Sequence, residues 1–159
     1  MNRRNAMLVA GAVGLAAVAA VGVQYPNYKR AKRDAELMRN ENRVESLISR
    51  EIARGDGTRV DLDKLVDLPW NRVYVLAPYT TFESARREMP GAWCLRDHAG
   101  IDLRDDICIL AFYEGSKLVA RIPQPRALGD FSGAVRQGGY PRGAARFRLA
   151  GGRAVYDAG

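Results

Sequence analysis

Apolar and polar residues follow three successive patterns along the chain, and each pattern predicts a different kind of segment. Residues 6–23 are apolar and carry no charge. Residues 28–54 contain neither Gly nor Pro, and their apolar positions recur at helical spacing. Beyond residue 58, short alternating runs typical of strands are separated by Gly and Pro. The pattern predicts a leader over 1–27, an amphipathic helix or stalk over 28–57, and a globular domain over 58–159.

The apolar segment 6–23 follows Arg3 and Arg4, and it fits either an uncleaved membrane anchor or a cleaved secretion signal. No cysteine comes directly after it, so the anchor of a lipoprotein is not expected. Basic residues on both sides compete under the positive-inside rule, while the five residues that precede the segment favour export. We expect membrane association through residues 6–23, at the inner membrane facing the periplasm or in the periplasm after cleavage.

The second segment predicts a charged helix with one narrow apolar stripe. We expect Pro26 to separate this helix from the apolar one, and the Gly-Asp-Gly sequence at 55–57 to end it. Two interpretations stay open: the stripe packs on its own domain, or it pairs with another helix as a stalk. The stripe consists of Leu37, Val44, Leu47, Ile48 and Ile52.

The pattern of residues 58–159 predicts an α+β fold: a small, mostly antiparallel sheet with one or two packed helices. Residues 72–77 alternate as a buried strand that ends at Pro78, which has no N–H to donate to a sheet. Thr80 and Glu83 have the spacing of a capping box and predict the start of a helix. Residues 107–122 predict a hairpin that turns at Gly115.

A second hairpin is predicted near the end of the chain, around Gly151 and Gly152. We expect Phe147 and Leu149 to pair with Val155 on its buried face. Arg146 and Arg148 then lie on the opposite, solvated face. Residues 123–143, between the two hairpins, predict a long loop that is functional, mobile or contains a short helix.

One motif resembles a known group of proteins. The sequence W-N-R-V-Y-V-L-A-P-Y-T, from Trp70 to Thr80, is followed by a short predicted helix and a strand hairpin. In this it is similar to small exported bacterial proteins of unknown function that carry W-x-x-V-Y-x-x-x-P-Y-T. The resemblance covers roughly residues 68–150 and implies an envelope location and an α+β fold, but no catalytic residue.

Charge is divided unevenly along the chain, which has a net charge of +7. Residues 1–59 carry 11 basic and 6 acidic groups, residues 60–116 carry 6 and 10, and residues 117–159 carry 8 and 2. A uniformly basic nucleic-acid surface would not show this distribution, and the aromatic-basic motifs of RNA-binding modules are absent from the sequence. Nucleic acid is therefore not the expected partner.

The candidate catalytic groups are few. His98 is the only histidine, so a small hydrolase would have to use it with Cys94, whereas the simpler interpretation is a surface loop histidine. Cys94 and Cys108 could form a disulfide in an oxidising compartment, although Cys108 lies in a predicted strand where a buried free thiol is common. The loose acidic run around residues 97–106 lacks the pattern of a calcium loop, and neither a metal nor a cofactor is expected.

These patterns favour a membrane-associated envelope protein that binds a protein partner and has no catalytic role. The alternatives are the hydrolase using Cys94 and His98, and a membrane-surface module using the C-terminal arginines. A ligand could meet the turn after the strand at 72–77, where backbone N–H groups are free at a helix start. The candidate binding residues are Trp70, Tyr79, Thr80, Thr81, Arg146 and Arg148.

Overall fold

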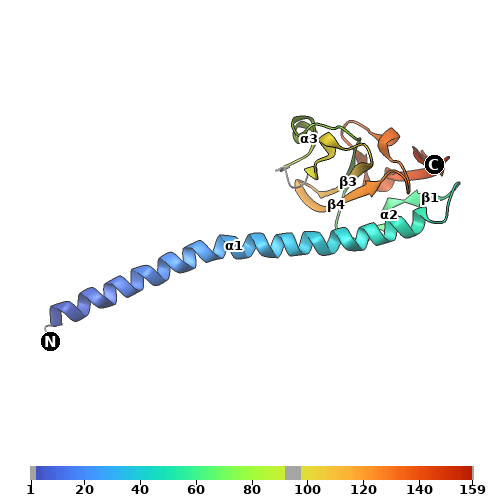
Figure 1. The fold of residues 1–159 in the computed structure, drawn as a ribbon. Helices are drawn as coiled ribbons and strands as arrows, with labels where there is room; N and C mark the ends of the chain where they lie inside the picture. Colours follow the sequence, from blue (N-terminus) through green and yellow to red (C-terminus); the bar gives the residue numbers. More distant parts are fainter. Residues whose placement is uncertain (1–2, 92–97, 159) are drawn as a thin grey trace. The chain divides into compact units, whose positions relative to one another are not determined.

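The protein has the predicted α+β class in a computed structural model. Its backbone is described for residues 3–91 and 98–158, and its side chains for residues 28–91 and 98–158. Figure 1 shows the chain coloured from blue at its N-terminus to red at its C-terminus. Short 3-10 helices, which we call η, connect several of the elements. In chain order the elements are α1 (Arg3–Ile52), β1 (Arg59–Asp61), α2 (Leu62–Leu65), β2 (Arg72–Leu76), α3 (Phe82–Glu88), η1 (Ile101–Leu103), β3 (Ile107–Glu114), β4 (Lys117–Pro125), η2 (Ser132–Ala134), β5 (Tyr140–Pro141), η3 (Arg142–Ala144), β6 (Arg146–Ala150) and β7 (Arg153–Tyr156).

The chain divides into two compact units, residues 1–36 and 37–159. The segment boundaries predicted at residues 27 and 57 stay predictions. The expected break at Pro26 is wrong, because α1 is continuous through it. Proline removes one hydrogen bond and favours a kink, but it does not oblige a helix to end. Among the described side chains no helix is long and apolar enough to cross a membrane, and the span assigned to residues 6–23 lies outside them.

The C-terminal part of α1 belongs to the core of the second unit. Val44, Ile48 and Ile52 are buried there, which confirms that the apolar stripe packs on its own domain. Two polar contacts to β4 add to this packing. The Asn40 side chain donates to the Val119 carbonyl at 2.8 Å, and Glu41 forms an ion pair with Arg121 at 3.2 Å.

Two antiparallel sheets form the rest of the unit. The first has the strand order β4-β3-β2-β5, and the second has the order β1-β6-β7. The predicted hairpin at 107–122 is confirmed as β3 and β4, with its turn at residues 115–116. Almost every residue of β2 and β3 is buried, because these two strands lie in the middle of the first sheet and are covered on both faces.

The core therefore has two layers, one on each face of the four-stranded sheet. On one face, Leu110 and Phe112 pack with residues of α1, β1 and β6 in the larger cluster. On the other face, Ile109 and Tyr113 pack with α3 and η1 in a smaller cluster. Period-two alternation in β3 thus separates two hydrophobic layers instead of a buried face from a wet one.

The segment between the hairpins contains short 3-10 helices, which confirms one of the three alternatives predicted for it, and a two-residue strand that sequence patterning missed. It contains η2, β5 and η3, and Phe131, Ala134 and Tyr140 are buried within it. Asp130 joins it to β7, because its carbonyl accepts a hydrogen bond from the Ala154 N–H at 2.8 Å. Burial opposes ionisation of the Asp130 carboxyl, but hydrogen bonds from Arg126 and Ser132 outweigh it and hold its pKa at about 2.

The second hairpin is confirmed with a different register. Gly151 and Gly152 form its turn, and Phe147 and Leu149 are buried as predicted. The residue beside Leu149 is Ala154, whereas Val155 pairs with Arg148 and is 49% exposed. The predicted pairing of Val155 is wrong because a two-residue turn fixes Ala150 opposite Arg153, which puts even-numbered residues of β7 on the buried face.

Candidate functional site

Trp70, the first residue of the motif, is part of the core. Its ring is 3% exposed and meets the edge of Phe112 with centroids 5.3 Å apart. Its indole Nε1 donates to the Val66 carbonyl at 3.1 Å, so the polar atom of the ring is satisfied inside the protein. Trp70 therefore packs as a structural residue and offers no surface to a ligand.

Arg142 completes the environment of this tryptophan, and sequence reasoning did not identify it. Its guanidinium carbon lies 5.2 Å from the centre of the Trp70 ring, within the range of a cation–π contact. The same group bonds Asp63 and donates to the Leu68 carbonyl at 3.1 Å. One side chain thus joins η3 to α2 and to the segment between α2 and β2.

Tyr79, Thr80 and Thr81 lie at the other end of β2, so the structure does not bring them together with Trp70. Tyr79 is 61% exposed with a left-handed φ of 61°, and its N–H donates to the Ile101 carbonyl at 2.9 Å. Thr80 is not the helix cap that its spacing predicts, since its hydroxyl donates to the Ala77 carbonyl at 2.6 Å. Thr81 caps α3 instead and accepts from the Ser84 N–H.

His98 is buried, which corrects the expectation of a surface loop histidine. It is 1% exposed, packs against the Phe82 ring, and has its Nε2 3.6 Å from a carboxylate oxygen of Asp102. Apolar packing by α3 explains the burial. The predicted catalytic partner, Cys94, lies outside the described residues.

Cys108 is buried on β3, with no disulfide to any described residue, and burial raises the pKa of its thiol to about 11. It is therefore protonated at neutral pH and a poor nucleophile. The predicted disulfide requires Cys94, outside the described residues, and stays a prediction. Within the ranges 28–91 and 98–158, no group of three or more His, Cys, Asp or Glu side chains is placed to hold a metal ion.

Arg146 and Arg148 lie on the exposed face of the three-stranded sheet, as their alternation with buried Phe147 predicts. Arg148 lies directly opposite Arg59 of β1 on one side and Val155 of β7 on the other. Arg153 shares this exposed face by alternation along β7. We call Arg59, Arg146, Arg148, Arg153 and Val155 the arginine face.

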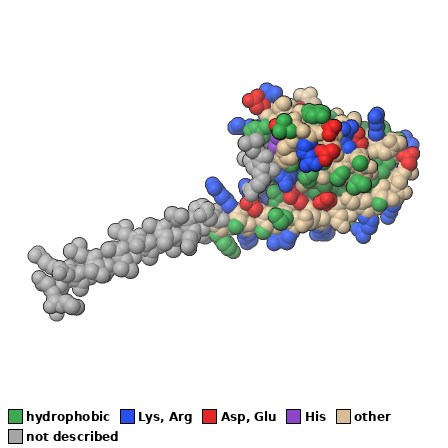
Figure 2. All heavy atoms as spheres, viewed as in Figure 1, with side chains coloured by type: hydrophobic (Ala, Val, Ile, Leu, Met, Phe, Trp, Pro, Cys, Tyr) green, Lys and Arg blue, Asp and Glu red, His purple; other side chains and the backbone are tan. Residues whose placement is uncertain are grey.

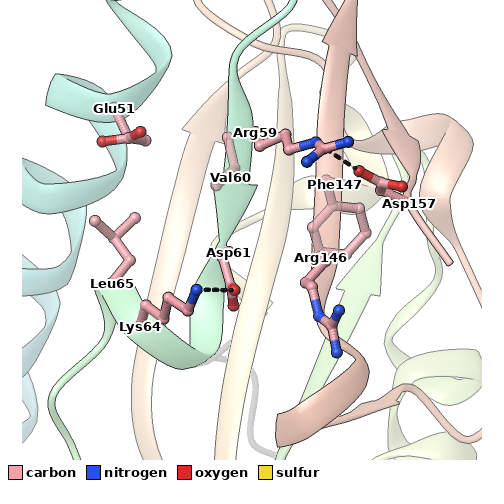
Figure 3. Close-up of a pocket in the computed structure, with 9 residues that line it drawn as sticks. All are labelled: Glu51, Arg59, Val60, Asp61, Lys64, Leu65, Arg146, Phe147 and Asp157. Carbon is pink, nitrogen blue, oxygen red and sulfur yellow. Dashed lines mark ion pairs between the residues drawn. The ribbon is translucent and has the colours of Figure 1, made fainter. Parts of the chain in front are cut away.

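A pocket of about 480 Å³ adjoins the arginine face (Figure 3). It is formed by side chains from the end of α1, from β1 and α2, from the start of β6, and from the residue after β7. Nine residues line it: Glu51, Arg59, Val60, Asp61, Lys64, Leu65, Arg146, Phe147 and Asp157. Arg146 is the only one of these that sequence reasoning assigned to a site.

Most charges of the pocket form pairs with one another. The Arg59 Nε lies 3.2 Å from a carboxylate oxygen of Asp157, and the Lys64 amine lies 3.8 Å from one of Asp61 (Figure 3). Arg146 differs, since its guanidinium donates to the Gly143 carbonyl at 2.8 Å and forms no ion pair within the described part of the chain. Arg148 likewise forms no ion pair there.

The pocket escaped prediction because its lining comes from segments that are distant in the sequence. β1 has only three residues, too few to show alternation, yet it carries Arg59 and Asp61 beside β6. The sequence did show Arg146 and Arg148 alternating with Phe147 and Leu149. This alternation identifies the exposed face of β6 but not the strands that lie beside it.

Comparisons with protein-family models, with curated proteins and with solved structures found no match.

Proposed function

We propose that the protein is a membrane-associated binding protein of the cell envelope, without a catalytic role, and that a partner protein docks on the arginine face by an acidic segment. Arg59 and Arg148 carry this proposal. They are cross-strand neighbours on an exposed sheet face, and like charges in this arrangement repel each other. Asp157 relieves the repulsion at Arg59, and an anion bound at Arg148 would relieve it further.

The charge balance of the face supports an anionic partner. Arg59 is compensated by Asp157, but Arg148 and Arg153 form no ion pair with any described residue. Both are exposed, so their guanidinium groups remain available for bidentate hydrogen bonds to carboxylates. Complementary charge of this kind contributes most to the association rate and to partner selection.

A protein segment fits this surface better than a lipid headgroup layer. Val155 lies beside Arg148 and is half exposed, which offers an apolar contact between the charges. Asp61 and Asp157 lie among the arginines, so the surface suits a partner that places its charges at separate points better than a uniformly anionic bilayer, which binds predominantly basic surfaces. The face visible in Figure 2 carries both basic and acidic side chains.

We expect the full chain, solubilised in a neutral detergent, to bind a fluorescent peptide of alternating Glu and Val, and to bind the Gln and Val counterpart much more weakly. Arg148→Gln should weaken binding of the acidic peptide about tenfold, because a charge-assisted hydrogen bond is lost. The binding should also weaken as salt rises, since exposed charges are screened. Fluorescence anisotropy at two salt concentrations measures both effects.

Arg86→Gln is the matched control, because Arg86 is exposed on α3 and does not belong to the arginine face. It should leave the affinity for the acidic peptide unchanged. Equal affinities of the wild-type chain and Arg148→Gln would contradict the docking site. If micelles doped with anionic lipid bind in an Arg148-dependent manner while the peptide does not, the membrane-surface interpretation replaces the protein partner.

The envelope location is a separate part of the proposal, supported by the basic residues before segment 6–23 and by its apolar composition. A reporter enzyme that is active only outside the cytoplasm, fused after Gly159, should be active. A matched fusion to a reporter that works only in the cytoplasm serves as the control. Activity of the second fusion alone would show that the domain stays inside the cell.

A further inference from the structure

The pocket beside the arginine face has the size of a site for a small ligand or for one or two side chains, which typically measures about 300 to 1,000 Å³. It is distinct from Arg148 and Arg153, which lie on the open sheet and do not line it. A separate group can therefore be bound there.

The charges around the pocket leave one cation uncompensated. Each of its three carboxylates has a basic partner: Glu51 with Arg54 at 2.7 Å, Asp61 with Lys64 at 3.8 Å, and Asp157 with Arg59 at 3.2 Å. Arg146 is the remaining basic group, held by its single hydrogen bond to the Gly143 carbonyl. The lining itself is neutral, with three basic and three acidic groups, but Glu51 pairs with Arg54 outside the pocket, which leaves Arg146 without an acidic partner among the described residues. One unmatched guanidinium suits a monoanion, whereas the three carboxylates would disfavour a group with two negative charges.

The rest of the lining supplies apolar contact. Leu65 is half buried at the wall and is the apolar side chain that a ligand can reach, whereas Val60 and Phe147 are fully buried behind it. The aliphatic stems of Arg59 and Lys64 extend this surface, since long basic side chains place methylene groups against a ligand while their charged ends stay in water. The pocket therefore combines one available guanidinium with a short apolar wall.

We infer that this pocket binds a carboxylate that ends a short apolar stem, with Arg146 as its main anchor and Leu65 as its apolar contact. Lys64 is the second cation. Its side chain is 86% exposed and its amine is 3.8 Å from Asp61, beyond direct hydrogen-bond distance, so it can turn toward an incoming carboxylate at little cost. If the carboxylate is the C-terminus of the docked partner, the inference rests on the proposed function. If it belongs to a free small molecule, its binding does not require the docking of a partner.

The test uses three soluble probes with the full chain in neutral detergent. N-acetyl-leucine carries both the carboxylate and the stem, N-acetyl-leucinamide lacks the charge, and N-acetylglycine lacks the stem. We expect N-acetyl-leucine to bind at least about tenfold more tightly than either control, on the usual scale of a charge-assisted hydrogen bond or of a buried aliphatic side chain. NMR titration of the arginine side-chain signals gives the affinities and locates the probe.

Arg146→Gln and Lys64→Gln should each weaken the binding of N-acetyl-leucine, by more for Arg146, while Arg86→Gln should leave it unchanged. Both substitutions are at exposed positions, so the fold should persist. Equal binding of N-acetyl-leucine and its amide, or an undiminished affinity in Arg146→Gln, would overturn the inference.

Two further arms distinguish the sources of the carboxylate. A Glu-rich hexapeptide ending in leucine is compared with its C-terminally amidated form. A partner's C-terminus is supported if the free-acid peptide binds more tightly than N-acetyl-leucine. In that case, amidating the peptide and the Arg148→Gln substitution in the protein should each weaken the binding of the peptide. Equal affinities of the peptide and N-acetyl-leucine, both insensitive to Arg148→Gln, support a free small carboxylate; the pocket inference then holds while the proposed docking face fails.

Discussion

Trp70→Ala should destabilise the folded protein by about 4 kcal/mol, on the scale of large-to-small changes in a packed core. The substitution removes a ring that is 3% exposed, together with its edge contact to Phe112. It also leaves the Val66 carbonyl without its indole donor and Arg142 without the ring beneath it. Urea denaturation of the full chain and the variant, followed by far-ultraviolet circular dichroism, measures the change.

Two controls separate packing from the other contributions. Trp70→Phe retains an aromatic ring but loses the hydrogen bond, and it should be milder than the alanine variant. Tyr79→Phe, at the opposite end of β2, should be close to neutral, because this side chain is 61% exposed and its hydroxyl forms no hydrogen bond with the residues that the structure describes. A loss below about 1 kcal/mol for Trp70→Ala, the typical effect of a surface residue or a single hydrogen bond, would contradict the core role of the motif.

The elements that patterning predicted are those whose partners lie nearby in the sequence. The hairpin of β3 and β4 is dominated by a two-residue turn and two long apolar strands, so its local signal was sufficient. The same holds for β6 and β7, although the exposed position of Val155 shows that a turn fixes register more firmly than residue type does.

The elements that patterning missed are stabilised by residues far away in the chain. β1 and β5 have three and two residues, and each exists because a longer strand, β6 or β2, pairs with it. Arg142 is similar, since nothing in its local sequence indicates that it bonds Asp63 and covers Trp70. Tertiary contacts of this kind have no short-range signature.

The helix cap shows a subtler limit. The spacing of Thr80 and Glu83 predicted Thr80 as the N-cap of a helix, and a helix does begin there, but its N-cap is Thr81. The reason is the left-handed backbone at Tyr79, which lets the Thr80 hydroxyl bond the Ala77 carbonyl and moves the helix start by one residue. A left-handed tyrosine is uncommon, so sequence alone did not suggest this turn.

For the candidate site, the sequence identified single residues, whereas only the structure shows which residues lie beside them. Alternation predicted that Arg146 and Arg148 lie on a solvent-exposed face, and both are exposed in the structure. The like-charge pair with Arg59 and the pocket walls depend on β1 lying beside β6, a contact across more than eighty residues. Trp70 shows the reverse case, because its conspicuous motif packs in the core and serves the fold.

Gly139→Ala should destabilise the protein by about 3 kcal/mol, combining backbone strain with a steric overlap. Gly139 has a φ of 64°, which an alanine adopts only at a cost. A Cβ at this position would lie 2.5 Å from the Val73 carbonyl oxygen and 2.9 Å from the Tyr74 ring. Because Val73 pairs with Tyr140 in the next strand, relief of this overlap would force β5 away from β2.

Gly138→Ala is the matched control for this prediction, since the neighbouring residue has a similar φ of 72° but no atom within 4 Å of the position of a new Cβ. It should show the backbone strain alone, about 1 kcal/mol. The difference between the two variants then isolates the close approach of the chain to β2. Parallel urea denaturation of both measures it, and hydrogen exchange at the Tyr140 amide should accelerate only in Gly139→Ala. Equal losses in the two variants would mean that β5 yields without cost, and that the edge of the four-stranded sheet does not depend on this glycine.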